Sequence, residues 1–151
     1  MDTLIYFVLR REVILTLGVG LIYVIFGSFS EFWWAPSNML AVIWSFTPLA
    51  FLGVGQTVVV ISGGFDLSVG SLYGLSATVG SLLSHGELSF AVVLMGVLVL
   101  GVAVGLINGL LVVKLGIPSF VATFGMLAIL RSLMYVINNV TGVWNFPIHF
   151  S

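Results

Sequence analysis

Residues 58–74 read VVVISGGFDLSVGSLYG, and this stretch decides how the chain folds. An apolar run enters Ser62-Gly63-Gly64, passes Asp66, which is the only charged residue within 32–86, and becomes apolar again at Val69. Paired glycines end a helix at little cost, because glycine adopts the left-handed conformation freely. An aspartate just after them accepts hydrogen bonds from the free N–H groups that begin the next helix. We therefore expect two helices joined by a tight polar turn that reverses the chain at a membrane surface.

The composition excludes a water-soluble domain. Hydrophobic residues make up 60% of the 151 residues and charged residues only 6%, whereas soluble domains carry about 25% charged residues. The net charge of −1 leaves no basic patch for nucleic acid. The absence of cysteine excludes a disulfide framework and thiolate chemistry.

Charged residues divide the sequence into long uncharged runs. A helix that crosses a bilayer needs about 20 apolar residues, and backbone groups cannot stay unpaired in lipid. We therefore predict an all-α polytopic transmembrane bundle, with residues 1–151 forming a single transmembrane domain. The predicted spans are residues 13–29, 40–61, 67–83, 88–113 and 119–138.

The first predicted span has a second interpretation as a signal peptide. Arg10 and Arg11 precede its apolar core, and Ser28-Phe29-Ser30 resembles a cleavage site flanked by small residues. We favour an uncleaved span, because the apolar run is long for a signal and the chain continues as membrane sequence.

The positions of lysine and arginine predict the orientation. With a cytoplasmic N-terminus, Arg10, Arg11 and Lys114 all lie inside, and the outer loops contain no lysine or arginine. The turn formed by Gly63, Gly64 and Asp66 then faces the cytoplasm, and residues 140–151 lie outside.

Small residues recur at helical spacing inside two predicted spans. Gly101, Gly105 and Gly109 share one face of the fourth span, and Gly70 and Gly74 repeat the spacing on the third. Such faces let helix backbones approach closely in lipid. We interpret all five glycines as helix-packing residues.

No catalytic or metal-binding motif occurs in the sequence, so we expect a non-enzymatic membrane protein without a metal.

Polar residues at membrane depth either form hydrogen bonds between helices, the commoner role, or line a path for a polar solute. Asp66 either caps a helix or contacts a cytoplasmic partner. Arg131, about 18 Å along its helix, either extends outward to the interface or neutralises a group inside the bundle. The candidates for a translocation pathway are Gln56, Ser71, Asn108, Thr123 and Arg131.

Two stretches resemble a known family. Residues 60–71, VISGGFDLSVGS, resemble the signature turn of the membrane subunits of bacterial ABC importers for monosaccharides of the ribose, xylose and galactose type. Residues 105–133, GLINGLLVVKLGIPSFVATFGMLAILRSL, resemble the stretch that follows in that family, in which a glycine-rich helix leads through a short basic loop and Ile-Pro to an apolar helix carrying arginine.

The resemblance implies a multi-pass permease that dimerises, with itself or with a related subunit, in the bacterial inner membrane. A periplasmic solute-binding protein would deliver the solute, and a cytoplasmic ATP-binding subunit would drive alternating access. ATP would bind to that partner, and this chain would bind no cofactor.

Members of the resembled family are longer and contain more spans, so we expect residues 1–151 to be the N-terminal half of such a permease. The alternative is a non-transporting helical membrane scaffold or assembly protein whose polar residues serve only packing. Pentoses, hexoses and sugar-like signalling molecules are all compatible with the resemblance.

Overall fold

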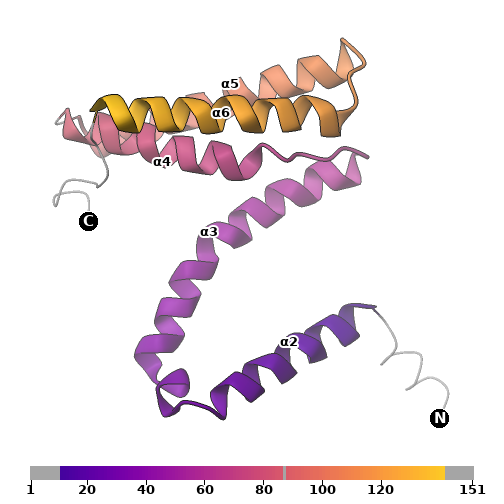
Figure 1. The fold of residues 1–151 in the computed structure, drawn as a ribbon, viewed down its shortest axis with the longest axis vertical. Helices are drawn as coiled ribbons and strands as arrows, with labels where there is room; N and C mark the ends of the chain where they lie inside the picture. Colours follow the sequence, from indigo (N-terminus) through magenta and orange to yellow (C-terminus); the bar gives the residue numbers. More distant parts are fainter. Residues whose placement is uncertain (1–10, 87, 142–151) are drawn as a thin grey trace. The chain divides into compact units, whose positions relative to one another are not determined.

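The protein folds into helices, and the predicted all-α class is confirmed. The structure, a computed structural model, describes residues 11–86 and 88–141 and contains no strand within them. By contact the chain divides into two units, Met1–Phe51 and Leu52–Ser151. The helices of the described residues (Figure 1) are α2 (Arg11–Gly27), the short 3-10 helix η1 (Glu31–Trp34), α3 (Pro36–Ile61), α4 (Val69–His85), α5 (Phe90–Val113) and α6 (Ser119–Thr141).

The helices have the length and composition of a polytopic membrane protein. Among the described residues, α3, α5 and α6 are long and apolar enough to cross a membrane. Helices α2 and α4 have 17 residues each, which corresponds to about 26 Å. The third predicted span, residues 67–83, lies at Val69–His85 in the structure, because the chain becomes helical only after Ser68.

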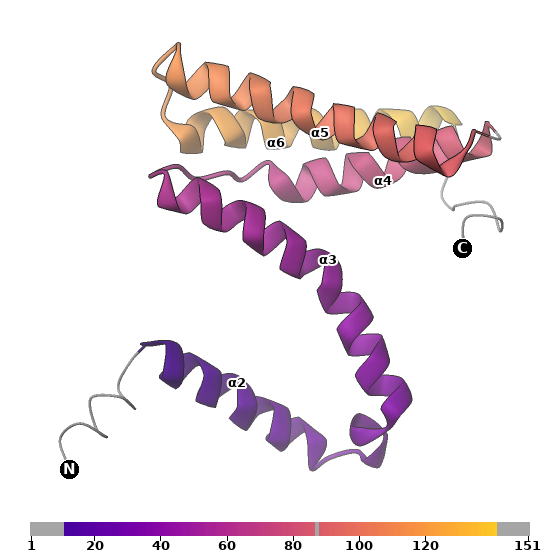
Figure 2. The same ribbon diagram turned by 180° about the vertical axis from the view of Figure 1, so that it is seen from behind.

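The second unit is built on three helices that pack side by side. Helix α4 contacts both α5 and α6, as Figures 1 and 2 show from opposite sides. The core cluster takes Leu75 from α4, Val104 from α5, and Met126 and Leu130 from α6. Most other large apolar side chains of this unit are exposed, as expected for helices whose outer surface contacts lipid rather than water.

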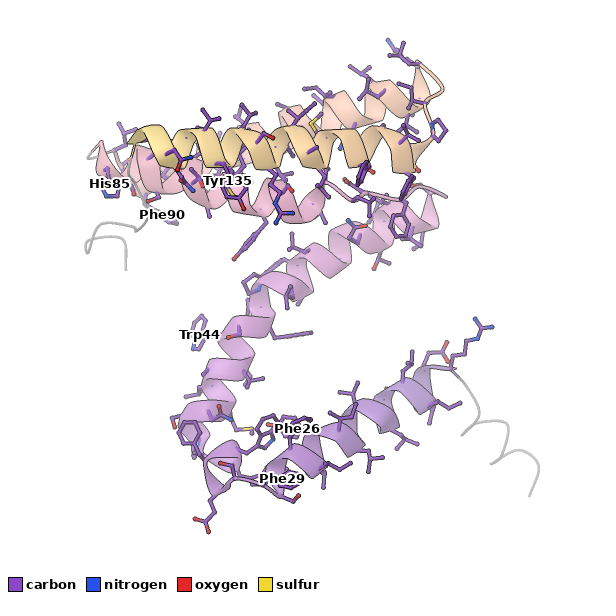
Figure 3. The ribbon with its side chains drawn as sticks, in the orientation of Figure 1. Phe26, Phe29, Trp44, His85, Phe90 and Tyr135 are labelled. Atoms are coloured by element: carbon purple, nitrogen blue, oxygen red, sulfur yellow. The ribbon has the colours of Figure 1, made fainter. Side chains whose placement is uncertain are left out.

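In the first unit, aromatic side chains connect α2 to η1. The Trp34 indole Nε1–H donates to the Gly27 carbonyl at 3.0 Å, and the Trp34 ring occupies the place where a Cβ on Gly27 would stand. The Tyr23 hydroxyl donates to Met39 Sδ at 3.0 Å. Trp44 projects from α3 (Figure 3) and is 73% exposed.

The orientation across the membrane stays a prediction. Lys114 and Ser119 bound the connection between α5 and α6, and hydrogen bonds place residues 62–68 at the same end of the second unit. His85 and Phe90 lie at its other end (Figure 3). The predictions for Arg10 and for residues 142–151 concern residues outside the described part of the chain.

Candidate functional site

Helix α3 ends in the way the paired glycines predict. Gly63 has φ +80°, in the left-handed region that favours glycine. Its N–H donates to the Val60 carbonyl at 3.0 Å, and the Gly64 N–H donates to the Val59 carbonyl at 3.0 Å. This pair of bonds is the Schellman motif, which satisfies carbonyls left open at a helix end.

The chain beyond these glycines differs from the expected tight turn. Residues 62–68, here called the turn segment, separate α3 from α4 (Figure 1), and none of them is helical. The Phe65 N–H donates to Ser119 Oγ at 3.1 Å, and the Leu67 N–H donates to Thr123 Oγ1 at 3.1 Å. Because Thr123 lies one turn inside α6, the segment runs about 6 Å along that helix before α4 begins.

The Asp66 carboxylate binds the residue that precedes α4 rather than the N–H groups of the first turn of α4. Its Oδ1 accepts hydrogen bonds from the backbone N–H of Ser68 at 2.7 Å and from the Ser68 hydroxyl at 2.6 Å. The expected cap is therefore an Asx-type turn that holds the residue preceding the helix. The Gln56 amide Nε2 donates to the Asp66 carbonyl at 2.7 Å, which fixes the same residue from α3.

Asn108 of α5 supports the turn segment from a third helix. Its Nδ2 donates to Ser68 Oγ at 3.0 Å, and Ser68 is fully buried. A carboxylate only accepts hydrogen bonds, so the Ser68 hydroxyl must donate to Asp66 and accept from Asn108. This direction assigns the amide nitrogen of Asn108 to Ser68 and leaves its Oδ1 elsewhere, buried and without a partner among the described residues.

Along the turn segment, side chains thus take the place of the backbone partners that a helix would supply. Thr123 Oγ1, which accepts from Leu67, shares its own proton between the Phe65 carbonyl at 3.1 Å and the Ser119 carbonyl at 2.8 Å. Buried backbone groups outside a helix need such partners, because an unpaired N–H or C=O away from water costs free energy. The structure brings three of the sequence candidates, Gln56, Asn108 and Thr123, to this one segment.

Ser119 is a residue that the sequence reasoning missed. It accepts from Phe65 and shares a helix face with Thr123, four residues further along α6. The Ser-x-x-x-Thr spacing directly after Ile-Pro was the available signal, because i and i+4 positions lie on the same side of a helix.

A cavity of about 650 Å³ lies between the turn segment, the end of α5 and the start of α6. Asp66, Asn108 and Thr123 contribute polar side chains to its lining. Gly105 and Gly109 of α5 also line it, and a Cβ built on either would meet no atom within 4 Å. The cavity therefore combines apolar walls with a few polar groups, as binding pockets commonly do.

The other two candidates meet at a second place. Ser71 of α4 and Arg131 of α6 line a smaller cavity of about 340 Å³, together with Gly70 and Gly74. Arg131 is exposed, and its guanidinium group forms no ion pair or hydrogen bond with another described residue. It lies eight residues beyond Thr123, or about 12 Å along α6, so the sequence candidates form two groups.

The five glycines of the predicted packing faces differ in their surroundings. A Cβ on Gly74 would stand 2.9 Å from Met134 Sδ of α6, so α4 and α6 approach closely there. A Cβ on the other four would meet no atom within 4 Å, and their packing role stays a prediction. These four are Gly70, Gly101, Gly105 and Gly109.

Among the residues that the structure describes, no group of three or more His, Cys, Asp or Glu side chains could hold a metal ion. The polar groups around the turn segment are amide, hydroxyl and carboxylate groups, and they suit hydrogen bonding to a polar ligand.

Comparison with known proteins adds a family. Residues 38–147 match the family described as "Branched-chain amino acid transport system / permease component". The chain is 34% identical over 125 residues to the autoinducer 2 import system permease protein LsrC of Escherichia coli (strain K12 / DH10B), covering 83% of this chain and 36% of that protein. It is 32% identical over 134 residues to the D-allose transport system permease protein AlsC of Escherichia coli (strain K12), covering 87% and 41%.

The protein named LsrC in Salmonella typhi is 32% identical over 125 residues. The chain thus spans less than half the length of these curated relatives. No solved structure matches it.

Proposed function

The chain belongs to the family of branched-chain amino acid transport system permease components, and from this membership we propose that it is a transmembrane permease subunit of an ATP-driven importer for a monosaccharide or a sugar-like molecule. The family description names amino acid transport. The relatives LsrC and AlsC are named for autoinducer 2 and D-allose, which supports the sugar-type solute.

The turn segment is the observation that carries this proposal. Its backbone leaves helical geometry beside a cavity of about 650 Å³ and is held by side chains from three helices. Ligand pockets commonly lie between packed helices and combine apolar walls with a few convergent polar groups, as this cavity does.

The proposed mechanism is alternating access along a path between helices. Gln56, Asn108 and Thr123 would border the path at the turn segment, and Ser71 and Arg131 would border it at the second cavity. The curated relatives are longer than this chain, so we propose that these residues work within a larger permease.

The proposed assembly lies in the bacterial inner membrane. Its partners would be a second permease subunit, a cytoplasmic ATP-binding subunit and a periplasmic solute-binding protein. ATP would bind to the ATP-binding subunit, and this chain would hold no cofactor of its own.

The test is co-purification followed by uptake. The complete permease that contains this sequence is expressed with candidate ATP-binding and solute-binding proteins, and the complex is isolated and reconstituted in vesicles. We expect both partners to co-purify and labelled D-allose or D-ribose to accumulate only with ATP. Isolation of the permease without either partner, and no accumulation of either sugar, would favour the scaffold.

A further inference from the structure

Asn108 carries an unusual unpaired group. The residue is 6% exposed, its Nδ2 is committed to Ser68, and its buried Oδ1 has no partner among the described residues. Buried acceptors in folded proteins nearly always have a partner, because leaving one unmade costs free energy. The residue lines the larger cavity, so a ligand there supplies the missing donor once the side chain turns to uncover its Oδ1, whose surface is almost fully covered.

Asp66 offers a second acceptor in the same cavity. Its Oδ1 accepts both bonds from Ser68, and its Oδ2 has no hydrogen bond or ion pair with any described residue. A carboxylate offers about four lone-pair positions in all, so capacity remains. The side chain is half-buried and lines the cavity.

A single hydroxyl joins these two side chains. Ser68 Oγ lies 3.0 Å from Asn108 Nδ2 and 2.6 Å from Asp66 Oδ1, so the two free acceptors lie on adjacent groups. Gly105 and Gly109 precede and follow Asn108 on α5 without side chains, and a Cβ on either would meet open space. The cavity wall beside Asn108 is therefore bare backbone, which leaves room for a ligand.

Two adjacent acceptors select a ligand that carries several donors. A calcium ion takes six to eight oxygen ligands, commonly including several carboxylates, and Asp66 is the only carboxylate in the lining. A polyol presents hydroxyl donors on neighbouring carbons, and its C–H faces suit the apolar lining that Val59, Val112 and Ile117 provide.

We propose that Asp66 and Asn108 form a subsite that accepts hydrogen bonds from two hydroxyl groups of a polyol solute in the cavity of about 650 Å³. The subsite rests on the proposed import function and deepens it by naming the side chains that would bind the hydroxyl groups of the solute. Ser68 is then a positioning residue that holds both acceptors in register.

The test uses the complete importer in vesicles and compares the parent sugar with analogues that each lack one hydroxyl. We expect Asn108→Ala and Asp66→Asn each to raise KM for the parent sugar by about tenfold, the equivalent of one hydrogen bond. Each variant should also stop discriminating against one particular deoxy analogue. Thr78→Val is the matched control, because Thr78 is buried but bonds only to Gly74 of its own helix.

Ser68→Ala distinguishes the positioning of the two acceptors from their direct contact with the solute. It removes the hydroxyl that joins the two acceptors but removes neither acceptor, so it should raise KM for the parent sugar and for every deoxy analogue by a similar factor. Gly105→Val tests the cavity without touching either acceptor and should raise KM, because its side chain fills the space beside Asn108. If Asn108→Ala and Asp66→Asn do not reach the membrane, the KM of Gly105→Val decides whether the solute occupies this cavity.

Two results would overturn the subsite while the import function stands. One is sugar uptake with unchanged KM and unchanged hydroxyl preference in the variants at Asp66, Asn108 and Gly105. The other is inhibition of uptake by methylammonium that disappears in Asp66→Asn, which would indicate a cation site. If the complete importer accumulates no monosaccharide at all, the proposed function itself is wrong, and the subsite with it.

Discussion

Replacing Thr123 by valine tests how the turn segment is held. The two side chains have nearly the same shape, but valine lacks the hydroxyl that accepts from the Leu67 N–H and donates to the Phe65 carbonyl. Thr123 is 3% exposed, so water does not readily replace the lost partner. Both backbone groups lie outside any helix, so no helical hydrogen bond can replace the lost ones.

The structure indicates the size of the effect. A buried polar group that loses its partner costs about 1–3 kcal/mol. Side-chain hydrogen bonds between membrane helices average only about 0.6 kcal/mol, because the separated helices find other partners. The larger range applies here because the partners of Thr123 are backbone groups of a non-helical segment. Local opening of the segment should therefore become about 5- to 150-fold more populated.

Hydrogen exchange of the peptide covering residues 62–68, measured in lipid nanodiscs, reports that opening directly. We expect exchange to accelerate by this factor in Thr123→Val. Thr57→Val is the control, because the Thr57 hydroxyl is exposed and bonds only to the Gly53 carbonyl of its own helix. Equal protection of the segment in the wild type and in Thr123→Val would refute the bracing that we assign to α6.

Three further predictions concern topology, helix termination and packing. A reporter fused after Leu115 should read cytoplasmic and one fused after Glu87 periplasmic, and the reverse pattern would contradict the orientation. Gly63→Ala should destabilise the protein by about 1–2 kcal/mol in detergent unfolding, because a side chain is strained at φ +80°; an unchanged midpoint would remove the left-handed role. Gly74→Leu should disrupt packing, measured by size-exclusion chromatography, more than Leu106→Ala does, because a Cβ on Gly74 would stand 2.9 Å from Met134 Sδ, and equal elution profiles would argue against close packing there.

Local features of the sequence were sufficient for the helices. Apolar composition predicted lipid as the solvent, and the predicted spans ended at Ile61 and Val113 and began at Ser119, where the structure has helix ends and a helix start. These properties are local, because the length of an apolar run and the conformational freedom of a glycine depend on nearby residues only. The length of the turn segment was misjudged, since Phe65 and Leu67 are apolar and resemble the start of a span.

What the sequence determined by itself was a chain of apolar helices, interrupted after Gly63 and Gly64, in a protein of the permease family. What only the tertiary structure decided was which polar residues meet. Gln56, Asn108 and Thr123 lie far apart along the chain, and they converge because α5 and α6 pack beside the turn segment. The backbone of that segment has no helical partners of its own, so its hydrogen bonds depend on which side chains the packing of neighbouring helices brings within reach.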